Sequence, residues 1–474
     1  MRRTLTRRSA KDRAVLPPYD PWLAASVAAD VWAASQASPA SLADRRERRL
    51  ADLLEAASRC SPLYRRLLAG RDPRSWRLEE LPIAHKTELM RDFGDWVAEP
   101  ANDLAALRTF IADPGRIGAP FLDRYTVWES SGSSGEPAVF VQDAAAMAVY
   151  DALEGLRRPF LRPGRSPLNA WHRGGQVAFV GAIDGHFAST VSIERLRRLN
   201  PALAVMLRTL SFLQPLERLV SELEQLSPVI IATYPSAAML LAEERRAGRL
   251  HIDPVEIWTG GETLSAPMRA TFEEGFDCAV ANNYGASEFL AIGSECRRGG
   301  LHLNSDWLIL EPVDECGRPV PPGTAGATTL LTNLANHLQP VIRYDIGDCV
   351  TVQAQPCPCG SHLPVIDVDG RSDDTLRLGS RNRPLRVLAL ALTTILEEEA
   401  GLFDFQLVQE GPSTLLLRSA GHGAETEAQL KRGRLALTRF LKDQGASGLR
   451  IHCRSGEQAA LSRSGKARRV VATP

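Results

Sequence analysis

A dense run of serine and glycine from Ser130 to Pro137 is the segment of this chain whose composition most directly indicates chemistry. Apolar or β-prone residues stand on both sides, at 125–128 and 138–141, so we expect a strand–loop–strand turn. Glycines let a backbone approach an anion closely, and the amides and hydroxyls of such a loop can surround phosphate oxygens. The alternative is a solvated hairpin loop. The spacing excludes a Walker loop and a nucleophile elbow.

Two further segments carry residues suited to nucleotide binding. The segment 282–288 follows an apolar run and should project from the carboxyl edge of a sheet, where open α/β folds bind ligands. In it, the Glu288 carboxylate can hold Mg²⁺ against phosphates, and Tyr284 with the glycine after it can pack on a base. Asp348 follows a glycine in a β-rich stretch and can accept two ribose hydroxyls. Alone, a segment such as 282–288 is more often a structural turn, and for Asp348 a salt-bridged turn is an equal alternative.

Two charged segments occur later in the chain. Residues 369–374 include Arg371 and Asp373 and coincide with a change in composition, which indicates a hinge between domains. Residues 463–470 are basic and place Lys466 directly after a glycine. A lysine on such a turn can reach a phosphate as a compact point charge, and the alternative is a solvated basic tail.

The cysteines indicate a metal site. Cys296 and His302 have five residues between them, and Cys357 and Cys359 have one. Three thiolates and one imidazole suit a tetrahedral structural Zn²⁺, although the one-residue spacing is shorter than the usual two to four. The alternatives are a reduced, metal-free loop and His362 as the fourth ligand.

Short apolar runs alternate with amphipathic segments between these clusters. Continuous apolar strands between helices indicate a covered, largely parallel sheet. We expect strands at 176–180, 229–233 and 256–259, helices at 40–68, 143–158, 215–226 and 237–247, a strand-rich region at 301–352, and C-terminal helices at 388–400 and 426–442.

Length and composition define the broad class. The 474 residues exceed what one hydrophobic core supports, so we expect a basic, partly disordered segment at 1–38, a large domain at 39–370 and a small mobile domain at 371–474. Equal numbers of basic and acidic residues, 56 each, argue against nucleic acid or an anionic membrane as partners. No apolar run approaches the roughly 18 residues that span a bilayer. Eight cysteines in so long a chain favour a reducing, cytoplasmic setting.

In order and spacing, these motifs resemble those of the adenylate-forming superfamily of acyl- and aryl-CoA synthetases, and within it the phenylacetate–CoA ligase and coenzyme F390 synthetase-like branch. The resemblance extends from about residue 81 to residue 470. It implies an α/β fold, in which a large domain of mixed sheets covered by helices carries a β-rich subdomain and is followed by a small mobile α+β domain.

The resemblance also implies roles for individual residues. Lys466, Glu288 and Ser287 would be catalytic, with Glu288 as the Mg²⁺ ligand, and Asp373 would be the hinge. The residues implied for ATP and AMP binding are Ser131, Gly132, Ser133, Ser134, Gly135, Gly261, Glu262, Asn283, Tyr284, Gly285, Asp348 and Arg371. Glu136 departs from the pattern because many members have lysine there, which removes a phosphate contact.

The implied reaction activates a carboxylic acid with ATP as an acyl-adenylate and then transfers the acyl group to a thiol, of coenzyme A or of carrier-protein phosphopantetheine. We expect a small, aromatic acid. Candidates for its pocket, from their positions at or between strand ends, are Tyr234, Pro235, His186, Phe187 and Trp258, with core packing as the alternative for each.

Two rival functions remain at this level. One is an F390-type transfer of the nucleotidyl group to a hydroxyl, and the other is a non-catalytic scaffold or regulator. The joint presence of Glu288, Asp348 and Lys466 argues against the second, because a binding-only protein has no need of all three. The sequence leaves the assembly state open, with a homodimer as one alternative.

Overall fold

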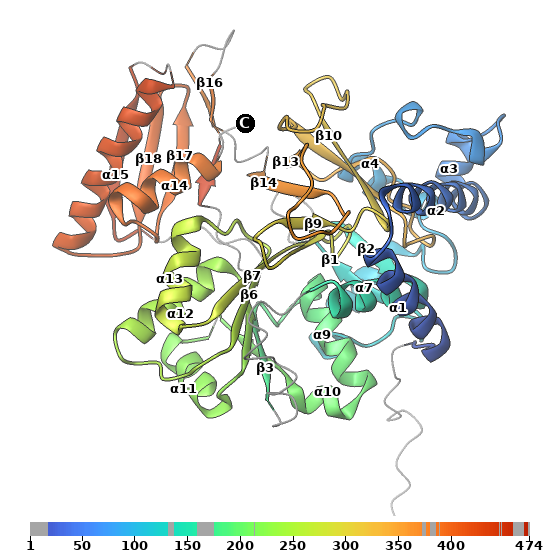
Figure 1. Cartoon of the computed structure of the whole chain (residues 1–474), viewed down its shortest axis with the longest axis horizontal. Helices are drawn as coiled ribbons and strands as arrows, with labels where there is room; N and C mark the ends of the chain where they lie inside the picture. The colour runs from blue at the N-terminus through green and yellow to red at the C-terminus, as the bar shows by residue number, and fades with distance from the viewer. Residues whose placement is uncertain are drawn as a thin grey trace, which may run out of the picture.

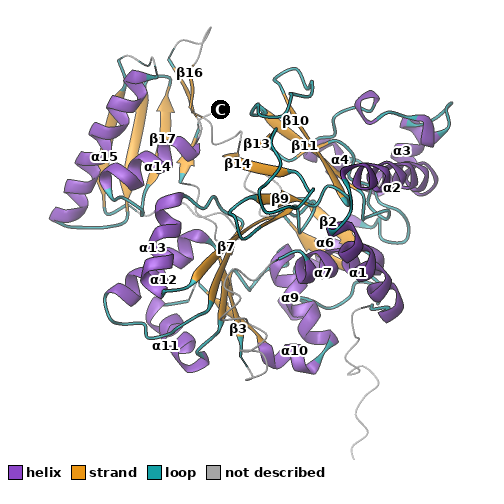
Figure 2. Cartoon of the chain, in the orientation of Figure 1, coloured by secondary structure: helices purple, strands orange, loops and turns teal. Residues whose placement is uncertain are grey.

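The computed structural model describes residues 18–130, 137–158, 175–212, 214–371, 376–379, 385–387, 389–444, 446, 448–457 and 469–472. Helices and strands alternate along it and build several sheets with helices around them, which confirms the predicted α/β fold class (Figure 2). Among the described helices, none is both long enough and apolar enough to cross a membrane.

Three helices come first, α1 (Pro21–Ser35), α2 (Pro39–Cys60) and α3 (Pro62–Leu67). Each begins with proline and is capped by the side chain before it, because Asp20, Ser38 and Ser61 accept hydrogen bonds from amides of the first turn. The prediction of one helix over 40–68 was wrong at Ser61. Pro62 has no N–H to continue the helical ladder, and Ser61 starts a new helix instead.

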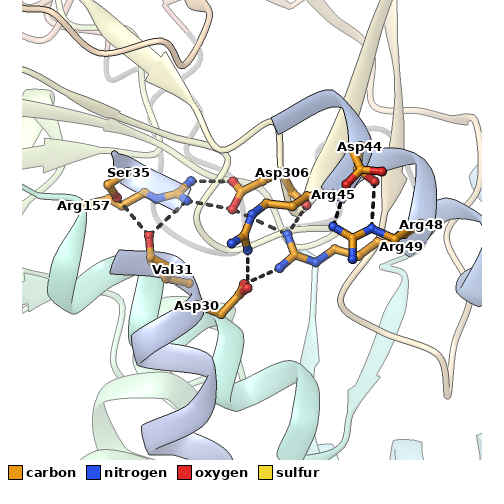
Figure 3. Close-up of polar contacts among 9 residues, drawn as sticks. All are labelled: Asp30, Val31, Ser35, Asp44, Arg45, Arg48, Arg49, Arg157 and Asp306. Atoms are coloured by element: carbon orange, nitrogen blue, oxygen red, sulfur yellow. Dashed lines mark hydrogen bonds and ion pairs between the residues drawn. The ribbon is translucent and has the colours of Figure 1, made fainter. Parts of the chain in front are cut away.

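A cluster of charges, buried at Asp306 and Arg157, joins the first two helices to the loop before β10 (Leu308–Val313) and to the end of α7 (Ala144–Leu156) (Figure 3). Asp306, in that loop, is fully buried and accepts hydrogen bonds from both terminal nitrogens of Arg157 at 2.6 and 2.7 Å. Arg49 of α2 donates to the Asp306 backbone carbonyl at 2.5 Å and pairs with Asp30 of α1. Arg45 also pairs with Asp30. Segments far apart in sequence therefore meet around one acidic side chain.

The largest sheet has nine strands in the order β13-β14-β9-β8-β7-β6-β5-β3-β4. Neighbours from β4 to β7 are parallel, and neighbours from β7 to β13 are antiparallel. The strands are β3 (Val177–Gly181), β4 (Leu207–Ser211), β5 (Ile230–Thr233), β6 (Glu256–Gly260), β7 (Ala279–Tyr284), β8 (Gly293–Glu295), β9 (Leu301–Leu303), β13 (Asp348–Val352) and β14 (Val365–Arg371). The three strands expected from apolar runs are β3, β5 and β6.

Helices cover both faces of the parallel part (Figure 1). On one side lie α11 (Leu216–Leu226), α12 (Pro235–Arg246) and α13 (Ala266–Phe276), and on the other lie α9 (Ala188–Leu199) and α10 (Pro201–Met206). Leu223, Met239 and Phe272 of the first group pack with Ile231 and Val280 of the strands in one buried cluster. Because both faces are buried, these strands read in the sequence as continuous apolar runs.

The hairpin of β1 (Thr126–Glu129) and β2 (Val139–Gln142) flanks the Ser/Gly loop, so the predicted strand–loop–strand is present. Its core includes the fully buried Trp96, Trp128 and Phe140. The elements around it are α4 (Lys86–Arg91), α5 (Phe93–Trp96), α6 (Leu104–Ile111) and α7 (Ala144–Leu156). In the region predicted to be strand-rich, β10 forms an antiparallel sheet with β11 (Thr328–Asn333) and β12 (Tyr344–Asp345).

The described residues from 376 onward have a hydrophobic core of their own. Its sheet has the order β19-β18-β17-β20 and packs against two helices. The elements are β15 (Leu376–Leu378), β16 (Leu385–Val387), α14 (Ala389–Ala400), β17 (Gln406–Gly411), β18 (Thr414–Ser419), α15 (Ala424–Asp443), β19 (Arg450–Ser455) and β20 (Val470–Val471). Figure 1 shows this unit beside α13, and a guanidinium nitrogen of Arg469 lies 3.7 Å from the Met268 sulfur of that helix.

Replacing Asp306 tests the buried charge cluster. Asp306→Asn keeps the shape of the side chain but removes the charge that Arg157 and Arg49 face, so we expect the free energy of unfolding to fall by about 3–5 kcal/mol. Arg48→Ala is the control, because its pair with Asp44 is two-thirds exposed and should contribute about 0–1 kcal/mol. Urea unfolding of both variants measures the difference, and equal effects would contradict the assigned role of Asp306.

Candidate active site

Predicted site residues from four segments gather at one edge of the nine-stranded sheet. The strands β3, β5, β6 and β7 are parallel neighbours, so their carboxyl ends lie side by side. Phe187, Tyr234, Gly261 and Gly285 each come shortly after one of these ends. In open α/β sheets, ligands bind in the crevice outside this edge. The fold therefore brings these residues to the expected place for a ligand.

The base of the Ser/Gly loop lies at the same edge. The amide of Ser130 donates to the Ala138 carbonyl at 2.8 Å, and the Ser130 hydroxyl accepts from the Ala138 amide at 2.9 Å. The amide of Glu129 donates to the carbonyl of His186 at 2.8 Å, close to the end of β3. The loop residues themselves lie outside the described residues, and their phosphate-binding role stays a prediction: Ser131, Gly132, Ser133, Ser134, Gly135 and Glu136.

Two buried side chains hold the segment after β7. The indole N–H of Trp128, in β1, donates to the Ser287 carbonyl at 2.8 Å. The Nδ2 of Asn333, at the end of β11, donates to the Glu288 carbonyl at 2.9 Å and to the Tyr150 hydroxyl at 3.0 Å. These bonds anchor the main chain, while the Glu288 side chain is half-buried. Sequence reasoning missed both supports, because Trp128 resembles any core residue and Asn333 carries no local signal.

Three residues predicted to bind nucleotide converge from β7, β13 and β14. The hydroxyl of Tyr284 donates to Oδ2 of Asp348 at 2.5 Å. Asp348 begins β13 and pairs in register with Arg371, the last residue of β14. The side chain of Arg371 and the whole of Asp373 and Lys466 lie outside the described residues, so their roles stay predictions.

Arg158 links two predicted residues, although the sequence did not single it out. Its guanidinium lies 4.2 Å from the ring centroid of Trp258, and its Nε donates to Oδ1 of Asn283 at 3.2 Å. It also pairs with Glu154, one turn earlier in α7. Stacking and planar hydrogen bonding are typical of arginine. A positive charge is therefore held beside the end of β7.

The Glu262 carboxylate contacts the start of α12. The amide and hydroxyl of Ser236 each donate to one of its oxygens at 3.0 Å, which places a negative charge at the helix N-terminus. Tyr234 is buried edge-to-face against Phe212, with ring centroids 5.8 Å apart. Burial, together with the charge of Glu262, raises the pKa of Tyr234 to about 12. Both side chains therefore help to fix the turns after β5 and β6.

A cavity of ≈ 530 Å³ opens beside the base of the Ser/Gly loop, with Glu129, Pro137 and Phe187 in its wall. This volume is within the range of small-molecule sites, about 300–1,000 Å³. Phe187 is thus one acyl-pocket candidate that lines a cavity. His186 is buried with its ring 5.5 Å from that of Phe110, and burial lowers the pKa of His186, which favours the neutral ring at pH 7.

The chain is similar to known CoA ligases in sequence and in fold. No family model matches the chain. Over 459 residues it is 28% identical to the phenylacetate-coenzyme A ligase of Thermus thermophilus, an alignment that covers 90% of this chain and 95% of that protein. Its fold matches a structure of 2-hydroxyisobutyryl-CoA ligase in the postadenylation state, with a TM-score of 0.67, 20% identity and coverage of 90% of this chain and 89% of that one.

The sequence-based identification as an adenylate-forming ligase is confirmed. A structure of 2-hydroxyisobutyryl-CoA ligase in the thioesterification state gives a lower TM-score, 0.53, at 20% identity and with coverage of 90% of this chain and 88% of that one. The whole-chain arrangement of this protein is therefore more similar to the postadenylation state of 2-hydroxyisobutyryl-CoA ligase than to its thioesterification state.

Removing Asn333 tests how the segment after β7 is held. Asn333→Ala leaves the buried Tyr150 hydroxyl and the Glu288 carbonyl without this donor, so we expect a loss of about 1–3 kcal/mol in unfolding free energy. We also expect faster hydrogen exchange at 286–290. Asn102→Ala is the control, because its one bond, to the Gly94 carbonyl, is exposed and should change stability by no more than about 0.5 kcal/mol. Unchanged exchange at 286–290 would contradict the anchoring role.

Proposed function

We propose that this protein activates a small aromatic carboxylic acid with ATP and transfers the acyl group to coenzyme A. The contact between Tyr284 and Asp348 is the observation that supports this best, because it joins a ring suited to a base with a carboxylate suited to a ribose. Tyr284 ends β7, so this contact lies near the edge of the nine-stranded sheet at which the Ser/Gly loop begins. The similarity to a phenylacetate-coenzyme A ligase supports an aromatic acid.

In the proposed first step, a carboxylate oxygen of the acid attacks the α-phosphorus of ATP. A phosphorus–oxygen bond to the acid forms, the bond to the β-phosphate bridge breaks, and pyrophosphate leaves. The protein's contribution is positioning and charge stabilisation. We assign the base and ribose to Tyr284 and Asp348, the triphosphate to the loop 131–135, and the α-phosphate to the Ser287 hydroxyl and the Lys466 ammonium.

We assign Mg²⁺ to the Glu288 carboxylate. Its side chain is half-buried, and it comes four residues after Tyr284 in the segment that Asn333 and Trp128 anchor. Mg²⁺ in proteins is commonly held by one or two carboxylates together with substrate phosphates and water, and this arrangement fits that requirement. When bound, the ion neutralises charge on the phosphates.

In the proposed second step, the sulfur of coenzyme A attacks the carbonyl carbon of the mixed anhydride. A carbon–sulfur bond forms, the carbon–oxygen bond to phosphate breaks, and AMP leaves. Rotation of the small domain about Asp373 would admit the thiol. Carrier-protein phosphopantetheine is the other acceptor that this chemistry allows. A reducing compartment, the cytoplasm, suits a chain whose described cysteines form no disulfide.

Exchange of label between pyrophosphate and ATP tests the first step. We expect Mg²⁺-dependent exchange that is strongest with benzoate-like or arylacetate-like acids. Glu288→Gln should slow it by about 10²-fold, because the variant holds the metal less well. Glu274→Gln removes an exposed carboxylate of α13 and should exchange normally. If ATP binds but no acid in a panel of aryl and fatty acids supports exchange, the proposal is wrong, and transfer of the nucleotidyl group to a hydroxyl becomes the better hypothesis.

Measuring the two half-reactions separately tests Lys466. Lys466→Ala should slow adenylate formation by about 10²–10³-fold, because the charge stabilises the transition state of the first step alone. The same variant, given presynthesised acyl-adenylate and coenzyme A, should form thioester at close to the normal rate. Lys431→Ala removes an exposed lysine of α15 and should affect neither half-reaction. Equal losses in both half-reactions for Lys466→Ala would make the lysine structural.

A further inference from the structure

We propose that Cys296, His302, Cys357 and Cys359 bind one structural zinc ion that joins the strand pair β13 and β14 to the rest of the nine-stranded sheet. The ligand atoms of these four residues all lie within 4.8 Å of one another. Cys296 follows β8 and His302 lies in β9, whereas Cys357 and Cys359 lie in the connection between β13 and β14. The structure thus brings together two pairs that are 55 or more residues apart, and His362 is not part of the group.

The distances suit a tetrahedral ion. Bonds of about 2.3 Å to sulfur and 2.0–2.1 Å to nitrogen predict edges of about 3.8 Å between sulfurs and about 3.6 Å between sulfur and nitrogen. The sulfurs of Cys296 and Cys357 are 3.8 Å apart, and the Cys359 sulfur is 3.3 Å from Nε2 of His302. The first distance is far longer than a disulfide bond of about 2.05 Å.

The surroundings of the four residues also suit a metal. Nδ1 of His302 lies 2.9 Å from the Leu363 carbonyl, so a proton on Nδ1 leaves Nε2 as the ligand atom. The amide of Arg298 donates to the Cys296 sulfur at 3.4 Å, and the amide of Ser361 donates to the Cys359 sulfur at 3.5 Å. A Cβ added at Gly300 would lie 3.2 Å from the Cys357 sulfur. Glycine at this position therefore lets the turn between β8 and β9 lie close to the turn that contains Cys357.

The position of the four residues explains what the ion does. In the sheet order, β9 and β14 are neighbours, and we call the junction between them the seam. On its β9 side lies β7, which ends with Tyr284, and on its β14 side lies β13, which begins with Asp348. The register has two residue pairs across this seam, Val365 with His302 and Ile366 with Leu301, and the Leu303 amide donates to the Pro364 carbonyl at 2.8 Å. A zinc ion with ligands on both sides reinforces this short seam. Four protein ligands leave no open position, so the ion is structural.

Metal analysis of the full-length protein, purified without chelator, tests the proposal without any substrate. We expect about one zinc ion per chain, and a decrease of about tenfold or more in Cys359→Ser and in His302→Ala. Cys316→Ser is the matched control, because this cysteine is exposed and outside the group, and it should retain the ion. Removing zinc from the unmodified protein should lower its melting temperature, and adding zinc back should restore it.

Cobalt substitution covers the case in which the ligand variants fail to fold. Co²⁺ in the unmodified protein should give the visible bands of a tetrahedral ion and sulfur-to-cobalt charge transfer. The proposal is overturned if the folded protein contains no zinc and takes up none, if Cys359→Ser retains a full equivalent, or if cobalt gives the weak spectrum of an octahedral ion. Because these measurements use neither ATP nor an acid, their outcome is independent of the proposed reaction.

Discussion

The contact between Tyr284 and Asp348 requires the sheet to bring together two strands that are not neighbours. Three strands lie between β7 and β13. At about 4.8 Å per strand, a flat sheet would hold the two strands about 19 Å apart. The Tyr284 and Asp348 side chains span part of this gap, and twist of the sheet must close the rest. The strands in the middle, β8 and β9, have only three residues each. The site therefore depends on how sharply the sheet bends at its shortest strands.

Side-chain amides support the other part of the site, the hairpin of β1 and β2. A two-stranded hairpin is marginal by itself, and its edges expose unpaired backbone groups. Here the Val141 amide donates to the side chain of Gln339 at 2.7 Å, and Nδ2 of Asn336 donates to the Val141 carbonyl at 2.8 Å. Both amide side chains are buried. The loop after β11 thus takes the place of a third strand and holds the hairpin from which the Ser/Gly loop extends.

Sequence patterns predicted the parts of this molecule that depend on local chemistry. Buried parallel strands appeared as apolar runs, and the glycine turns after β6 and β7 placed Gly261 and Gly285 at strand ends. Contacts between distant residues left no comparable signal. Arg157 and Arg158 are adjacent in sequence, yet Arg157 binds the buried Asp306 and Arg158 stacks on Trp258. Their roles differ because the chain after α7 contacts the Asp306 loop with one residue and Trp258 of β6 with the next. The cysteine cluster could be predicted because ligand type restricts the chemistry, whereas the seam between β9 and β14 could not.

The buried Asp306 also determines how the chain tolerates cleavage. A protease cut in the connection between α2 and α3, followed by loss of the first helices, would remove Arg49 and its cation–π contact with Trp307, 3.5 Å from the ring centroid. Asp306 would keep Arg157, but its backbone carbonyl would lose a donor. The surface of α7 that α1 contacts would also be open to water. The N-terminal helices thus cover α7 and the loop that contains Asp306, and a shortened version that begins after α2 is a poor choice for crystallisation.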